Sequence, residues 1–414
     1  MCLKKEKLII VVGAGASIPF GNFSCLDIDT MFKTQGFNQL RTLPKHKYLY
    51  EYCSDEINKF IAGRTFFGKP QTSKKTTNFE QVIYEMLNIY ALTQEARNRT
   101  TGAFFDTKQF PEKIDILTGT SKKLDPYDFV YESEHLINLL AKEMRKRNLK
   151  FNAHPLFQNF QVLCSLLKKK YDIGVLNFNY DDIFEEGFSF TLNTGFNQNG
   201  TFEPMRIVKG EWNFLYYAHG SLHFDIDLYD NVDEYHYEKD LGKLIIKSPI
   251  IPTSAKTIEG FPILHTPIIV GYGKAYQTQR NPYSLYVNDF AKKIFEADKI
   301  LFIGYGFNDI YINNMISLSM NFNRKRKVVV VDYAAPDEPK DCIHIGHYEN
   351  LYRTIPFDAM DFRPTDVHAI DFDRSNKADR PLSVSFRGFD YFINNPEKLL
   401  NERPPCPSPT PRVH

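Results

Sequence analysis

The sequence predicts an α/β fold in which a parallel sheet carries helices on its faces and a large helical insertion interrupts the chain. An apolar run at residues 8–12, rich in β-branched side chains, is typical of a strand buried on both faces of a parallel sheet. This run leads directly into a glycine turn at residues 13–17, and a second apolar run at residues 299–303 is likewise followed by glycines. Strand, helix and strand then follow one another to residue 331, which is the order of parallel crossover units.

Composition excludes several other classes of protein. The 414 residues include 51 Lys and Arg against 50 Asp and Glu, so the chain lacks the basic excess of a nucleic-acid binder, and we expect no direct nucleic-acid contact. The 35 Phe and 24 Tyr residues favour a packed globular protein over a disordered one. No apolar run approaches the roughly 18–20 residues that span a membrane, and the first strand leaves no room for a signal peptide. We therefore expect a cytoplasmic protein without membrane contact.

The cysteines predict neither a disulfide framework nor a zinc site. None of them forms a CxxC pair, and their spacing is too wide for a zinc ribbon. We expect reduced thiols, as in cytosolic proteins, and no bound metal. The six residues concerned are Cys2, Cys25, Cys53, Cys164, Cys342 and Cys406.

Further elements follow from hydrophobic periodicity. Strands are predicted at residues 172–179, 214–219, 244–246, 267–270 and 328–331. Helices are predicted at residues 79–87, 133–144, 290–295 and 311–318.

The helical segments before residue 160 predict an insertion into the α/β domain. An independent helical domain is the alternative, but strand-like segments resume afterwards, which favours insertion. The predicted organisation is an α/β domain at residues 1–21 and 161–335, an insertion at 22–160, a C-terminal extension packed on the core at 336–402, and a proline-rich disordered tail at 403–414.

Two glycine turns are candidate phosphate sites. Glycine lets the backbone approach a phosphate closely, and a helix that begins after the turn offers free N–H groups to the negative charge. The alternative is that the glycines only make tight turns. The residues are Gly13, Ala14, Gly15 and Ser17 in the first turn, and Gly304 and Gly306 in the second.

Polar residues follow the other predicted strands. Asn179 and Asp181 come after the strand that begins at residue 172, where ligands bind in open α/β sheets. The alternative for them is a strand-to-helix turn with an aspartate as helix cap. His219 follows the next strand and suits a general base, although a structural histidine is the commoner outcome.

Two aspartates complete the candidate set. Asp309 follows the second glycine turn, and either contacts a ligand or caps the next helix. Asp332 ends the strand at residues 328–331, where an acidic residue can bond ribose hydroxyls.

Taken in order, these motifs resemble the sirtuin (SIR2) family. The matching residues are the GAG-x-S turn at 13–17, the N-x-D pair of Asn179 and Asp181, the HGS motif at 219–221 and the glycine turn at 304–306. The form GY-x-F-x-D at residues 304–309 is more similar to the bacterial SIR2-like branch found in anti-phage defence proteins. The resemblance implies a Rossmann-like parallel sheet that binds NAD as a substrate, with no metal required.

The resemblance also implies a role for each candidate residue. Asn179 would hold the ribose or the attacking water, His219 would act as general base on a ribose hydroxyl, and Asp181 would support them. The pyrophosphate would lie at Gly13, Gly15 and Ser17, and the adenosine side at Gly304 and Gly306.

Departures from the sirtuin pattern point away from protein deacylation. Sirtuin deacylases carry a zinc module built on two cysteine pairs, which this sequence lacks. The step from Asn179 to His219 is also longer than expected for a deacylase. The resemblance then implies an NAD+ hydrolase that depletes NAD+ in anti-phage defence. Such a protein would be a homo-oligomer, paired with a HerA-type helicase ATPase. The alternatives are an NAD-dependent deacylase or ADP-ribosyltransferase, and a non-catalytic NAD or ADP-ribose sensor.

Overall fold

The computed structural model describes most of the chain. The ranges are residues 4–35, 48–62, 65–66, 69–70, 78–98, 114–115, 123–124, 126–148, 150–227, 234–244, 257–258, 261–262, 264–271, 274–323, 326–333, 347–355, 373–374 and 382–400. The predicted tail at residues 403–414 and most of the predicted strand at 244–246 lie outside them. Cys25, Cys53 and Cys164 lie within them and are free thiols.

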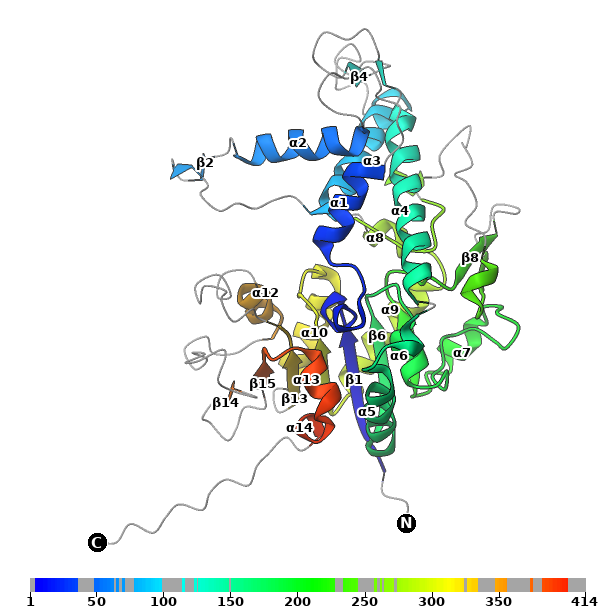
Figure 1. The fold of residues 1–414 in the computed structure, drawn as a ribbon, viewed down its shortest axis with the longest axis vertical. Coiled ribbons are helices and arrows are strands. Elements are labelled where there is room, and N and C mark those ends of the chain that lie inside the picture. The colour runs from blue at the N-terminus through cyan, green and yellow to red at the C-terminus, as the bar shows by residue number, and fades with distance from the viewer. Residues whose placement is uncertain are drawn as a thin grey trace.

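A seven-stranded sheet forms the centre of the α/β part (Figure 1). Its order is β14-β15-β13-β12-β1-β6-β7, and all neighbours pair in parallel except β14 with β15. The strands are β1 (Glu6–Val12), β6 (Tyr171–Asn177), β7 (Phe214–Tyr217), β12 (Lys299–Ile303), β13 (Lys327–Val331), β14 (Asp373–Arg374) and β15 (Leu382–Ser385).

The strand order confirms the predicted fold class. The six parallel strands, taken in chain order, run outward from β1 to β6 and β7 on one side, and to β12, β13 and β15 on the other. This is the order of the doubly wound folds, in which ligands bind at the carboxyl ends of the strands where the order reverses. Here that point lies between β1 and β12, the two strands that the predicted glycine turns follow.

The strand register brings the predicted motifs to one edge of the sheet. Val12, the last residue of β1, lies beside Ile303 of β12 and beside Asn177 of β6. Asn177 in turn lies beside Tyr217, the last residue of β7. Because these strands end level with one another, the loops that follow them start from a common edge.

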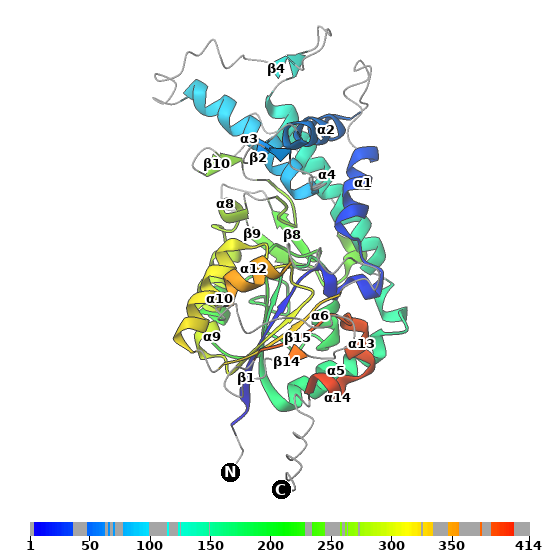
Figure 2. The same cartoon turned by 90° about the vertical axis from the view of Figure 1, so that its left-hand side faces the viewer.

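Helices cover both faces of the sheet (Figure 2). Helices α9 and α10 lie on one side, and α5, α13 and α14 on the other. The central strands are buried on both faces, which is why their sequences are continuous apolar runs instead of alternating ones. The helices of this part are α5 (Phe157–Lys170), α6 (Ile183–Gly187), α7 (Pro204–Val208), α8 (Lys274–Gln277), α9 (Tyr283–Glu296), α10 (Ile310–Phe322), α12 (His347–Thr354), α13 (Phe389–Asn394) and α14 (Pro396–Leu400).

A separate helical part lies beyond the carboxyl edge of the sheet (Figure 1). It comprises α1 (Cys25–Gln35), α2 (Leu49–Ala62), α3 (Phe79–Asn98) and α4 (Pro126–Asn148). These helices have their own hydrophobic core, and that core also takes in Tyr180, Leu222 and Ile268 from the loops of the α/β part. The helical part therefore packs directly on the loops that carry the candidate site.

Short two-stranded hairpins accompany these elements. Their strands are β2 (Thr65–Phe66), β3 (Lys69–Pro70), β4 (Ile114–Asp115), β5 (Lys123–Leu124), β8 (Phe224–Asp227), β9 (Glu234–Tyr237), β10 (Thr257–Ile258) and β11 (Phe261–Pro262). Within the ranges that are described, none of the helices combines the length and apolar character needed to cross a membrane.

Several predicted elements differ in detail. The strand predicted at residues 267–270 is wrong, because only Ile268 makes a bridge, to Gly220. Its apolar side chains are buried, Ile268 and Val270 in the helical core and Ile269 in the sheet core, so hydrophobicity alone suggested a strand. The domain boundaries stay a prediction, although Phe151 and α5 pack against the sheet and β15 extends the sheet beyond residue 335.

Candidate functional site

The glycine turns after β1 and β12 pack against each other. The amide of Gly13 donates to the carbonyl of Ile303 at 3.0 Å, and that of Gly15 donates to Gly304 at 3.2 Å. Two 3-10 turns follow, and α1 begins only at Cys25. The sequence had suggested a helix that starts directly after the glycine turn. Because both glycine amides bond within the protein, this geometry favours the tight-turn explanation; a pyrophosphate contact there stays a prediction.

Side chains at these glycines would collide with backbone. A Cβ at Gly13 would lie 2.5 Å from the carbonyl oxygen of Gly304, and a Cβ at Gly15 would lie 2.8 Å from the Cα of Gly304. Gly304 has φ +58°, and a Cβ there would come within 2.4 Å of the Ala16 nitrogen. Close approach of the two loops therefore explains all three glycines.

Asn179 joins the loop after β6 to the turn after β1. Its Nδ2 donates to the carbonyl of Gly13 at 2.8 Å and to the Ser17 hydroxyl at 2.7 Å. Its own amide donates to Oδ1 of Asn177, the last residue of β6. The neighbouring aromatic rings anchor this loop on both sides, since Phe178 belongs to the sheet core and Tyr180 to the helical core.

Asp181 is buried beside the same group. Its carboxylate accepts a hydrogen bond from Asn22 Nδ2 at 2.8 Å. Burial raises its pKa to about 6, although hydrogen bonds from Ser17 and Asn22 act in the opposite direction. Asp181 therefore supports Ser17, which in turn accepts the bond from Asn179.

His219 lies at the carboxyl end of β7, in a backbone path fixed by Gly220. Gly220 has φ +92°, and a Cβ there would lie 2.3 Å from the carbonyl oxygen of Pro267. The segment after Pro267 runs alongside, and Ile269 donates its amide hydrogen to the carbonyl of His219 at 2.7 Å. The histidine is thus held between the sheet and a segment whose Ile268 and Val270 belong to the helical core.

Both ring nitrogens of His219 have partners. Nε2 lies 3.0 Å from Oδ2 of Asp309, and Nδ1 lies 3.4 Å from Nζ of Lys274. Burial, followed by the charge of Lys274, lowers the pKa of His219, and this outweighs the opposing effect of Asp309. The imidazole is therefore neutral near pH 7, which is the form that a general base requires.

Asp309 caps the next helix, as one of the two predictions has it, and also contacts His219; contact with a ligand stays a prediction. One carboxylate oxygen contacts His219, and the other accepts the amide hydrogen of Ile312 at 3.1 Å, which caps α10. Capping therefore does not prevent Asp309 from facing the candidate base. The bond to Asp309 fixes the orientation of the His219 ring.

Aromatic ring contacts connect the loop that carries Asn179 with His219. The ring of Phe178 meets the ring of His219 edge-on, with centroids 4.9 Å apart, and it also contacts Tyr305 in the second glycine turn. The structure thus gathers most predicted residues into two groups: Gly13, Gly15, Ser17, Asn179, Asp181 and Gly304 in the first, and His219 with Asp309 in the second.

Three predicted residues stand apart from these groups. Asp332 follows β13 and makes backbone bonds with Ser385 and Gly388. Ala14 lies within the first 3-10 turn. A Cβ at Gly306 would meet only Asn308, so close packing does not explain this glycine as it does Gly304.

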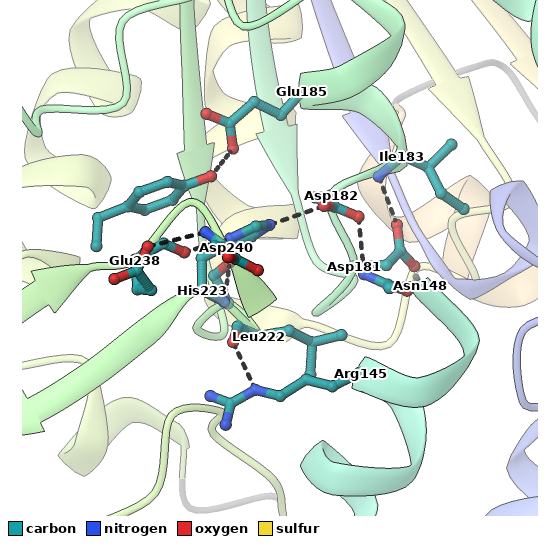
Figure 3. A network of polar contacts seen from close by, with 12 residues as sticks. Arg145, Asn148, Asp181, Asp182, Ile183, Glu185, Leu222, His223, Glu238 and Asp240 are labelled. Atoms are coloured by element: carbon teal, nitrogen blue, oxygen red, sulfur yellow. Dashed lines mark hydrogen bonds and ion pairs between the residues drawn. The ribbon is translucent and has the colours of Figure 1, made fainter. Parts of the chain in front are cut away.

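A second polar network was missed by the sequence analysis (Figure 3). Asp182 accepts hydrogen bonds from Asn148 at 2.7 Å and from His223 at 2.8 Å, and the other ring nitrogen of His223 lies 2.7 Å from the carbonyl of Glu238. Burial acts to lower the pKa of His223, but Asp182 more than compensates, and the pKa is raised. Because both ring nitrogens face acceptors, the surroundings favour the protonated form of His223, which makes a buried ion pair with Asp182.

The partners of Asp181 and His219 could not be recognised in the sequence. Asn22 lies within the segment assigned to the insertion, and Glu80 and Lys274 carry no local motif. They reach the site only through tertiary packing. Among the described residues, no group of three or more His, Cys, Asp or Glu side chains is arranged to hold a metal ion.

The fold and the site define a doubly wound α/β protein with buried polar groups at the switch point of its sheet. In a comparison with protein families, residues 174–351 match the family model described as SIR2-like domain. This segment, which contains Asn179, His219 and Asp309, is similar to that family.

Solved structures give a more distant likeness. A structure described as the structural basis of sirtuin substrate affinity is 12% identical, with 95% of this chain and 93% of that chain covered and a TM-score of 0.38. A Sir2 homologue–NAD complex is 12% identical, with 96% and 91% covered and a TM-score of 0.36. A mutant Sir2 homologue with ADP-ribose is 13% identical, with 97% and 96% covered and a TM-score of 0.38. At this distance the likeness carries no argument about function. No curated protein matches the chain.

Proposed function

We propose that this protein is a SIR2-like NAD+ hydrolase that cleaves NAD+ to nicotinamide and ADP-ribose. The observation that carries the proposal is the pairing of a buried, neutral His219 with Asp309, in contact with Phe178 of the loop that carries Asn179, at the carboxyl edge of a doubly wound sheet. The match of residues 174–351 to the SIR2-like domain supports the same chemistry.

The reaction breaks the bond between the ribose anomeric carbon and the nicotinamide nitrogen. The bonding electrons leave with nicotinamide, which becomes neutral, while positive charge develops on the ribose. A water oxygen then bonds to the anomeric carbon, and the water proton is taken up by His219, directly or through a ribose hydroxyl. The protein has to hold the ribose and the water in line.

Asn179 is suited to this positioning role. Both of the hydrogen bonds from its side-chain nitrogen go to the loop after β1, to Gly13 and Ser17. Its Oδ1 makes no hydrogen bond among the described residues, so it can accept one from the attacking water or a ribose hydroxyl. Its rigid attachment to two loops fixes where that oxygen lies.

We further propose that NAD+ depletion serves anti-phage defence. In this proposal the protein works as a homo-oligomer in the cytoplasm together with a HerA-type helicase ATPase. The form of the motif at residues 304–309 supports this branch of the SIR2-like proteins over the deacylases, as does the lack of cysteine pairs.

Release of nicotinamide from NAD+ tests the proposal. The purified protein is incubated with NAD+, with and without a co-expressed HerA-type partner, and the products are separated by chromatography. We expect nicotinamide and ADP-ribose in equal amounts, and loss of both with Asn179→Ala and with His219→Ala.

Matched controls use the same residue types at exposed positions. Asn199→Ala and His236→Ala change an exposed asparagine and an exposed histidine, and should keep full activity. Turnover that needs an acylated peptide would instead indicate a deacylase. Binding of NAD+ without turnover, with and without the partner, would indicate a sensor.

A further inference from the structure

Lys274 contacts the candidate base from a segment that the sequence motifs do not include. Its Nζ lies 3.4 Å from Nδ1 of His219 and donates a 2.7 Å hydrogen bond to Oε1 of Glu80 on α3. The lysine is only partly exposed, as is Glu80. It therefore bridges the helical part and the histidine at the carboxyl edge of the sheet.

The donor and acceptor chemistry fixes the tautomer of His219. A lysine ammonium can only donate, so Nδ1 must be the acceptor, and the hydrogen of the neutral ring must lie on Nε2. The carboxylate of Asp309 can only accept, and it faces Nε2 at 3.0 Å. Lys274 and Asp309 thus select the same tautomer from opposite sides of the ring.

The path of the chain holds Lys274 in place. Ile269, five residues before it, bonds to the His219 backbone, and the Cβ position of Gly271 lies 3.5 Å from the carbonyl oxygen of Glu80. Lys274 is the first residue of α8. Residues 269, 271 and 274, which are close together in the chain, therefore contact both His219 and α3.

We propose that Lys274 is a positioning residue for His219, which holds the neutral ring with its acceptor on Nδ1 and ties the state of this base to the helical part through Glu80. The proposal deepens the proposed function, since His219 is the base of that reaction. Nδ1 has one lone pair, so a substrate hydroxyl or water that gives its proton to Nδ1 must take the place of Lys274 there. Glu80 then retains the displaced ammonium.

Three charged groups among the described residues act on the pKa of His219. They are Asp309, which caps α10, Lys274 from α8 and Glu80 from α3. Asp309 and Glu80 favour the protonated ring, and Lys274 disfavours it together with burial. Removing the charge of Lys274 must therefore make His219 easier to protonate.

Titration of the His219 ring tests this directly, without substrate. The full-length protein with labelled histidines is titrated by NMR, and the His219→Gln variant identifies the resonance. Lys274→Met should move the His219 midpoint to higher pH, whereas Lys274→Arg, which keeps the charge, should restore a midpoint close to wild type. As a matched control, Lys146→Met removes another lysine that is paired with a glutamate, on α4, and should leave the midpoint unchanged.

The pH profile of NAD+ cleavage supplies the second readout. In Lys274→Met the acid limb of kcat/KM should shift to higher pH in step with the NMR midpoint. An unchanged midpoint in folded Lys274→Met, or a midpoint that Lys274→Arg shifts equally, overturns the proposal. A shifted midpoint in a protein that never cleaves NAD+ supports the positioning role and overturns only the proposed reaction.

Discussion

Asn179 donates a 2.8 Å hydrogen bond from Nδ2 to the backbone carbonyl of Gly13, although 166 positions separate the two residues in the chain. The same nitrogen also donates to Ser17. The loops after β1 and β6 therefore form one hydrogen-bonded unit, and the position of the asparagine depends on both.

Replacing Asn179 should affect stability and activity together. Asn179→Ala leaves the buried carbonyl of Gly13 without this donor, so we expect a loss of about 1–3 kcal/mol in the free energy of unfolding. The rate of NAD+ cleavage should fall by roughly 100-fold, because the water and ribose lose their positioning group. Denaturant unfolding and nicotinamide release measure the two effects. An active Asn179→Ala enzyme that unfolds like wild type would contradict the assignment.

The glycine at the second turn should tolerate no side chain. Gly304→Ala places a Cβ 2.4 Å from backbone atoms of Gly15 and Ala16 at a positive φ, so it should destabilise the protein by about 3 kcal/mol or more. Gly21→Ala is the matched control, because its φ is +82° but its Cβ would meet nothing within 4 Å. The control should cost only about 1 kcal/mol. Equal costs in thermal unfolding would show that the turn, not the close approach, requires glycine.

The two roles of Asp309 can be separated. Asp309→Ser keeps a side chain that can cap α10 but cannot reach His219 as the carboxylate does. We expect near-normal stability with nicotinamide release lowered by about tenfold or more, because the ring loses the group that orients it. Full activity of a stable Asp309→Ser variant would mean that Asp309 acts only as a cap.

The His223–Asp182 pair predicts a pH-dependent contribution to stability. A raised pKa in the folded state means that the contribution is complete below about pH 6.5, the ordinary histidine pKa, and is lost as the pH rises through the folded value. His223→Gln breaks a buried ion pair, so it should cost about 3 kcal/mol or more at acid pH. The difference from wild type should shrink as the pH rises. Thermal unfolding at pH 5.5 to 9 measures it, and a difference that grows with pH would refute the ion pair.

Asp181 should show the consequence of burying a carboxylate. Its pKa rises from 3.8 to about 6 in the folded protein, so its ionisation destabilises the fold as the pH rises from 4 to 6. Asp181→Asn removes this ionisation. Relative to wild type, the variant should therefore gain roughly 2.4 kcal/mol between pH 4 and pH 7.5. Denaturant unfolding at the two pH values tests this, and a constant difference would contradict a raised pKa.

The sequence predicted the site one residue at a time but not how the residues combine. Asn179 and His219 could be singled out because each follows a strand of a predicted parallel sheet, and such ends share an edge. Lys274 and Asn22 could not, because a lone lysine or asparagine carries no periodic or spacing signal. The sequence singled out the glycines as phosphate sites, which stays a prediction, and the structure adds a packing reason for Gly13, Gly15 and Gly304: their missing side chains allow two loops to touch.

The sequence by itself determined the parallel α/β core, because buried strands must be continuous apolar runs and turns at their ends need glycine and polar residues. Only the tertiary structure decided what surrounds the base. The charge state of His219 depends on burial, on Asp309 and on Lys274, and these are set by packing between segments far apart in the chain. Electrostatic effects in a protein interior depend on distance and desolvation, and neither quantity is encoded locally.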